Sequence, residues 1–150
     1  MLFAVLFAVT ILFISVLFYY NYNKEAYYAR DFDIEVLLSS TDFDNDGIDD
    51  YTDILQGAKI EAENKPKYKS VYYAGGYPPE NEGVCTDVIW RALKNAGYIL
   101  KDMVDEDIKN NLDKYPRVNG KPDSNIDFRR VPNLKVYFQR NQITLTKDLN

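Results

Sequence analysis

Residues 83–98, GVCTDVIWRALKNAGY, form the stretch that decides the fold, because they predict a buried amphipathic helix. The apolar side chains recur at helical spacing, at Val88, Ile89, Ala92, Leu93 and Ala96. Asp87 falls in the first turn, where a negative charge suits the helix dipole, and Gly97 suits a C-terminal cap. A cysteine-bearing helix is therefore expected over residues 84–97.

The same stretch contains the only cysteine of the chain, Cys85, at the expected start of the helix. Unpaired backbone N–H groups and the dipole at a helix start favour a thiolate, so Cys85 is a candidate nucleophile. The alternative is structural, because a free cysteine often only packs in the interior. A nucleophilic cysteine usually takes a histidine as its base, and the sequence contains no histidine. An ordinary Cys-His pair within this chain is therefore excluded.

Composition narrows the classes of function. A length of 150 residues suits one domain, with room for an attached membrane segment. The net charge is −5 and no basic patch stands out, which argues against nucleic-acid binding. One cysteine excludes an internal disulfide.

Residues 1–20, MLFAVLFAVTILFISVLFYY, carry no charged side chain and predict a transmembrane helix that acts as a signal anchor. The alternative is a cleaved signal peptide, although a basic n-region and a small-residue cleavage pattern are missing. The protein is therefore expected to be membrane-anchored on the extracytoplasmic face, or secreted if this segment is cleaved. Residues 21–41 are expected to form a polar linker or a weak helix.

The remaining chain, residues 42–150, is expected to form a mostly helical domain. Apolar residues at helical spacing predict three further helices, at residues 51–64, 101–114 and 131–140. Residues 69–79 are expected to be extended and to lead into a turn, and residues 115–125 to form a loop.

Residues 42–53, DFDNDGIDDYTD, form the most explicit ligand pattern in the sequence. Alternating carboxylates around a glycine turn can provide the six to eight oxygens that Ca²⁺ takes. The candidate calcium ligands are Asp42, Asp44, Asp46, Asp50 and Asp53, together with the backbone carbonyl of Ile48. The pattern departs from an EF-hand, because an aspartate closes the loop instead of a bidentate glutamate. The alternative is a solvated acidic turn in which Asp49 and Asp50 cap the following helix. Any bound calcium is expected to be structural.

Two further groups are candidates for substrate binding. Tyr73 and Tyr77 could line a cleft near Cys85, or they could be walls of the core. Arg129 and Arg130 could clamp a substrate carboxylate. Alternatively, one arginine pairs with the neighbouring Asp127, and this interpretation is favoured because buried turns need satisfied polar networks.

Several spaced motifs resemble one known family. The matching segments are GGYPP at 75–79, GVCTDVIWRAL at 83–93, DEDI at 105–108 and PDSNIDFRRVPNLKVYF at 122–138. They are similar to the exported bacterial domain-of-unknown-function 1287 family. The preceding DFDNDGIDDYTDILQGAK looks like the version of this family found in Gram-positive bacteria.

The resemblance implies an α+β papain-like fold of the NlpC type, in which a cysteine opens a helix that packs on an antiparallel sheet. It maps the nucleophile onto Cys85 and implies a relative of cysteine amidases or peptidases that act on cell-wall peptide. The present chain would be the mostly α-helical N-terminal part of that domain, truncated at its C-terminus. It is expected to be inactive as given, because no histidine matches the family's base. The alternative is a non-catalytic, calcium-stabilised surface module that binds a wall component or a protein partner.

Overall fold

The computed structural model of the protein describes residues 2–22 and 29–143. The chain divides into two compact units, Met1–Val36 and Leu37–Asn150. Residues 1, 23–28 and 144–150, which belong to the predicted segments 1–20, 21–41 and 42–150, lie outside the described residues.

The first unit contains helix α1 (Leu2–Tyr22) and a short 3-10 helix, η1 (Ala29–Phe32). The α1 segment has no proline or glycine to interrupt it. The hydroxyl groups of Thr10 and Ser15 are satisfied locally: they donate to the carbonyls of Phe7 and Leu12, each at 2.8 Å. Helix formation is thus accounted for by local sequence.

The expected transmembrane helix over residues 1–20 is not supported by the structure. A helix that spans a bilayer needs about 20 consecutive, predominantly apolar residues. Within residues 2–22 and 29–143, no helix has the length and apolar character that crossing a membrane requires. The prediction is therefore wrong: an apolar run was sufficient to predict a helix, but forming a helix does not by itself establish a membrane span.

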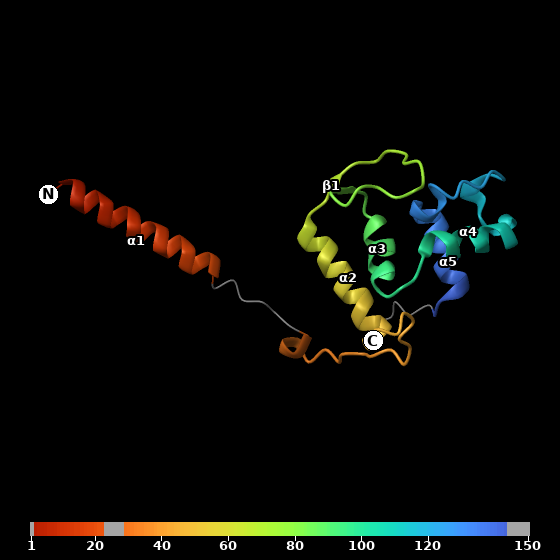
Figure 1. Ribbon diagram of the computed structural model, residues 1–150, viewed down its shortest axis with the longest axis horizontal. Helices are drawn as coiled ribbons and strands as arrows, with labels where there is room; N and C mark the ends of the chain where they lie inside the picture. The colour runs from red at the N-terminus through yellow and green to blue at the C-terminus, as the bar shows by residue number, and fades with distance from the viewer. Residues whose placement is uncertain (1, 23–28, 144–150) are drawn as a thin grey trace. The chain divides into compact units, whose positions relative to one another are not determined.

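The second unit contains four α-helices among its described residues. In chain order its elements are α2 (Asp50–Asn64), β1 (Lys67–Tyr68), β2 (Glu82–Gly83), α3 (Asp87–Asn95), α4 (Leu100–Asn110), η2 (Leu112–Lys114), η3 (Pro116–Val118), η4 (Asp127–Arg129) and α5 (Val131–Asn141) (Figure 1). The four helices that the sequence predicted in this part of the chain are confirmed, with shifted ends. The prediction that the helix over residues 84–97 would bear Cys85 is wrong, because α3 begins at Asp87 with Thr86 as its N-cap.

The hydrophobic core of the second unit is formed chiefly by α3, α4 and α5. Helix α4 supplies Leu100, Val104 and Ile108, which recur every four residues and therefore form one apolar stripe. The other buried members of the core are Trp90 of α3, Leu134 and Tyr137 of α5, and Tyr115, Val118 and Phe128 from the connecting segments. The core thus joins α3, whose sequence pattern predicted burial, to helices that follow it.

Helix α2 packs closely on α3, and the two helices lie side by side in Figure 1. A Cβ atom at Gly57 would lie 2.7 Å from the Asn95 Cβ and 2.9 Å from the Ala92 Cα. Only a glycine therefore fits this approach. The Asn95 amide also donates to the Asp53 carbonyl at 2.9 Å, which ties the end of α3 to the first turn of α2.

The only sheet among the described residues is a parallel pair of two-residue strands, with Lys67 opposite Glu82 and Tyr68 opposite Gly83. Strands this short present no apolar face on which a helix could pack. The papain-like α+β class implied by the family resemblance is therefore wrong for these residues. The protein is mostly helical because its helices bury their apolar faces against one another.

The fit at Gly57 generates a stability prediction. Replacing Gly57 with alanine should destabilise the protein by about 1–3 kcal/mol, because the added methyl group overpacks the contact with Ala92 and Asn95. Helix propensity alone predicts the opposite sign, since alanine is favoured over glycine in a helix by about 1 kcal/mol. Urea unfolding measures the change.

The matched control is Gln56→Ala, at an exposed position of the same helix. This variant should change the free energy of unfolding by no more than about 0.5 kcal/mol. A stabilised Gly57→Ala protein would contradict the close packing of α2 on α3.

Candidate functional site

Cys85 lies in the turn between β2 and α3, and its side chain is exposed. Helix α3 begins at Asp87 and Thr86 is its N-cap residue, so Cys85 precedes the helix by two positions. The residues on its C-terminal side, Thr86 and Asp87, are buried. The thiol therefore faces solvent from a turn that is anchored in the interior.

The anchor is a buried ion pair between Asp87 and Arg129. The Arg129 Nε donates to one carboxylate oxygen of Asp87 at 2.7 Å, and an Arg129 terminal nitrogen donates to the other at 2.8 Å. The Trp90 indole N–H and the Val84 backbone N–H donate to the same carboxylate at 2.8 and 2.7 Å. The Thr86 hydroxyl donates to the Arg129 carbonyl at 2.8 Å. These bonds hold the backbone on both sides of Cys85.

The electrostatics of Asp87 reflect this environment. Burial disfavours its charged form, but the bonds from Arg129, from the Val84 N–H and from Trp90 outweigh that effect. The pKa of Asp87 is consequently lowered. The sequence suggested only a helix-dipole role for Asp87, because its arginine partner lies 42 residues away.

The predicted substrate-binding arginines are both engaged in the fold. Arg129 is 6% exposed, and its guanidinium carbon lies 5.2 Å from the centre of the Tyr73 ring. Arg130 donates to the Asp127 carboxylate at 2.8 Å, which is the pairing that the sequence favoured. A carboxylate clamp by Arg129 and Arg130 has no support in these contacts and stays a prediction.

The two candidate tyrosines lie in different environments. Tyr73 is half-buried and its hydroxyl donates to Glu82 at 2.8 Å, so burial and this bond raise its pKa. The Tyr77 ring lies 4.8 Å from the Trp90 ring and 5.3 Å from the Phe128 ring, yet Tyr77 is 41% exposed. Tyr77 therefore covers the edge of the core while keeping a solvent-facing surface.

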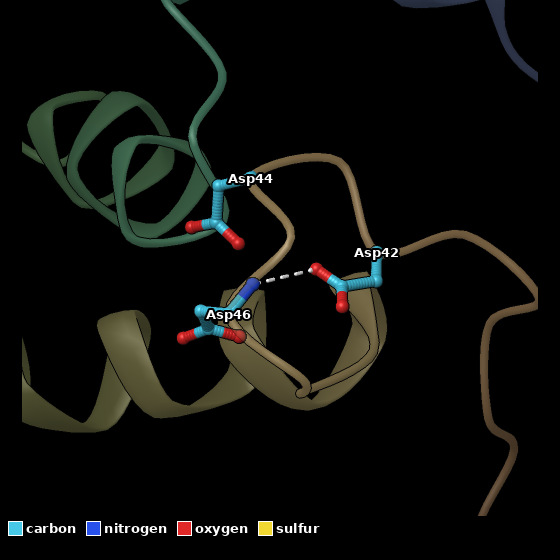
Figure 2. A group of neighbouring side chains, drawn as sticks. All are labelled: Asp42, Asp44 and Asp46. Atoms are coloured by element: carbon cyan, nitrogen blue, oxygen red, sulfur yellow. Dashed lines mark hydrogen bonds between the residues drawn. The ribbon is translucent and has the colours of Figure 1, made fainter.

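In the acidic loop, Asp42, Asp44 and Asp46 come together. Each offers a carboxylate oxygen, and these oxygens lie within 4.8 Å of one another (Figure 2). Asp42 accepts the backbone N–H of Asp46 at 3.2 Å and that of Gly47 at 2.9 Å. Gly47 has a φ of +95°, which suits a residue without a side chain. The loop thus brings together three of the predicted calcium ligands.

Two other aspartates of this loop are used by the fold. Asp49 is the N-cap of α2 and accepts the N–H groups of Tyr51 and Thr52, as the alternative interpretation of the loop predicted. Asp50 accepts the Phe43 N–H at 2.9 Å and the Tyr98 hydroxyl at 2.5 Å. The bond to Asp50, with burial, raises the pKa of Tyr98 to about 12. Asp50, a predicted metal ligand, therefore already has a partner for each oxygen.

Asp53, the last predicted ligand, is 2% exposed. Its Oδ2 atom has no hydrogen-bond partner among the described residues. Burial raises the pKa of Asp53, and repulsion from Asp46, Asp44 and Asp42 raises it further. Burying a charged carboxylate oxygen without a partner costs free energy, and a nearby positive charge would offset that cost at Asp53.

A second ion pair, which the sequence did not indicate, joins Arg91 of α3 to the buried Glu61 of α2. Arg91 also donates to the carbonyls of Pro79 and Glu82, at 3.0 and 2.9 Å. A pocket of about 350 Å³ lies beside this pair, lined by residues that include Ile60, Glu80, Trp90 and Lys94. Because Glu61 and Arg91 are 30 residues apart, no local pattern could have identified the pair.

Comparison with known proteins gives the family. The family described as "Domain of unknown function (DUF1287)" matches residues 55–150, which is more than half of the chain. The chain belongs to the DUF1287 family, as its motifs predicted.

The protein is similar to the uncharacterized protein YijF of Escherichia coli strain K12, with 44% identity over 81 residues. The aligned part covers 53% of this chain and 40% of YijF. No solved structure matches the chain. The comparisons therefore give membership of an uncharacterised family, and they assign no activity.

The buried pair generates a second prediction. Replacing Asp87 with alanine should destabilise the protein by about 3–5 kcal/mol, because Arg129 would remain buried without its partner. Denaturant unfolding of the purified variant measures the loss. Asp113→Ala is the control, because Asp113 forms an exposed ion pair with Lys114 and its removal should have little effect. Equal losses in the two variants would contradict the role assigned to Asp87.

A third prediction concerns pH. Because the pKa of Asp87 is lowered in the folded protein, its charge stabilises the protein above the ordinary aspartate pKa, and this contribution is lost as the pH falls. The stability advantage of the wild type over Asp87→Asn should therefore shrink as the pH decreases below about 4. Urea unfolding of both proteins from pH 7 to pH 2.5 measures it. An advantage that is constant or grows toward low pH would contradict the assignment.

Proposed function

We propose that this chain carries the nucleophile of a thiol-dependent amide hydrolase that acts on cell-wall peptide, with Cys85 as the attacking residue. The observation that carries the proposal is the contrast between Cys85 and its neighbours. The side chain of Cys85 is exposed, whereas Thr86 and Asp87 are buried and bonded to Arg129. A fixed, accessible thiol in the turn before a helix is an arrangement that suits covalent catalysis.

The chemistry follows from this placement. The Cys85 thiolate would attack the amide carbonyl and form a thioester as the amine leaves, and water would then hydrolyse the thioester. Backbone N–H groups at the start of α3 would stabilise the oxyanion. Since residues 1–150 include no histidine, the base would come from outside these residues. Cell-wall peptide as substrate and an extracytoplasmic location are parts of this proposal that rest on the family resemblance.

A second candidate is a non-catalytic surface module stabilised by calcium. The lack of histidine in residues 1–150 favours this candidate. It is also favoured by the ion pairs of Arg129 and Arg130, because arginines that are already paired are not available to bind a substrate carboxylate. Such a module would bind a wall component or a protein partner. The reactivity of Cys85 separates the two candidates.

The test is the rate of alkylation of Cys85 by iodoacetamide in the full chain at pH 7. A hydrolase nucleophile should react several-fold faster than the same cysteine in a short GVCTD peptide, because the folded protein activates its nucleophile and the peptide does not. Cys85→Ser is the blank, since it removes the only thiol. A rate equal to or below that of the peptide would overturn the hydrolase proposal and favour the binding module.

A further inference from the structure

The acidic loop, residues 42–53, takes no part in the proposed hydrolysis, and its carboxylates are not all explained by the fold. Asp49 caps α2, and Asp50 bonds to Phe43 and Tyr98. Three of the four other loop carboxylates, those of Asp42, Asp44 and Asp46, have oxygens within 4.8 Å of one another (Figure 2). Like charges this close repel one another unless a cation lies between them.

An independent observation comes from helix α2. Asp53 lies in its first turn, eleven residues after Asp42, and is 2% exposed. One of its carboxylate oxygens has no hydrogen-bond partner among the described residues. Repulsion from the charges of Asp46, Asp44, Asp42 and Asp49 acts on this carboxylate, so Asp53 lies in the electrostatic field of the loop. Among the described residues no cationic side chain bonds to this oxygen, and Arg91 of α3 is bonded to Glu61 instead.

We propose that Asp42, Asp44, Asp46 and Asp53 bind one Ca²⁺ ion. Carboxylate oxygens are the ligands that this hard cation takes, and a coordination number of six to eight leaves places for backbone carbonyls, such as that of Ile48, and for water. The ion supplies the partner that the unbonded Asp53 oxygen lacks. Mg²⁺ fits less well, because it requires near-octahedral geometry at shorter distances and keeps more of its water.

The position of the loop gives the ion a structural role. The Phe43 ring stacks on the Tyr98 ring with centroids 4.3 Å apart. A Cβ atom at Gly97 would lie 2.8 Å from the Asp44 Cβ, so the loop packs directly against the end of α3. Calcium thereby joins the loop, the first turn of α2 and the end of α3. This role does not depend on Cys85 and goes beyond the proposed hydrolysis.

Calorimetric titration of the full chain with CaCl₂ tests the proposal, with thermal unfolding at each calcium concentration. We expect one site with a Kd at or below about 1 mM, the range of extracellular calcium modules. At ten times the Kd, the melting temperature should rise by roughly 5–10 °C. MgCl₂ at the same concentration should produce a smaller shift. An absence of both heat and melting shift at 10 mM Ca²⁺ would overturn the proposal, as would an equal response to Mg²⁺.

Two variants locate the site. Asp53→Asn should bind calcium at least tenfold more weakly, and without calcium it should melt at or above the wild-type temperature because a repelled, buried charge is removed. Asp44→Asn, at an exposed position, should also lose at least tenfold in affinity. Asp113→Asn is the matched control outside the loop and should bind as the wild type does. Unchanged affinity in Asp44→Asn, or an equal loss in the control, would overturn the site.

Discussion

The structure of the second unit depends on the buried ion pair between Asp87 and Arg129. It connects the first turn of α3 to the segment that leads into α5, across 42 residues of sequence. Burying two charges is costly unless both are fully bonded. Here the carboxylate receives two bonds from the guanidinium, one from Trp90 and one from the Val84 backbone. This network holds the turn on both sides of Cys85, and the Cys85 side chain is exposed.

The same chain contains a buried carboxylate without such compensation. Asp53 is buried like Asp87, but one of its oxygens has no partner among the described residues, and the charges of four loop aspartates repel it. The contrast is informative because both residues occupy the first turn of a helix. In Asp87 the protein supplies the counter-charge itself, whereas the environment of Asp53 suits a counter-charge that is bound from solution. The calcium proposal follows from this difference.

Sequence comparison shows the family of this protein, whereas its function is a proposal. The DUF1287 match covers residues 55–150, and the similarity to YijF supports it. Neither the family nor YijF has a described activity. The chain spans 40% of the length of YijF, so the activity of a whole family member is a proposal here. The anchored turn around Cys85 supports the proposal of a nucleophile, and residues 1–150 contain no histidine that could act as its base.

The sequence by itself determined the features that depend on neighbouring residues. Apolar periodicity located the helices, and Asp49 was identified as a cap because its partners lie two and three residues away. The family was recognisable from contiguous motifs. The two failures, the transmembrane helix and the papain-like α+β class, came from extending a local or family pattern to a larger architecture.

Only the tertiary structure decided which charges meet. Asp87 with Arg129, Glu61 with Arg91, and Asp50 with Tyr98 are 42, 30 and 48 residues apart. Spacing within a helix or loop carries no information about such partners, because they are selected by how whole helices pack. The same packing buries Asp53 beside the loop and leaves Cys85 exposed at its turn. The sequence thus identified the candidate groups, and the fold decided which of them already have partners within the protein.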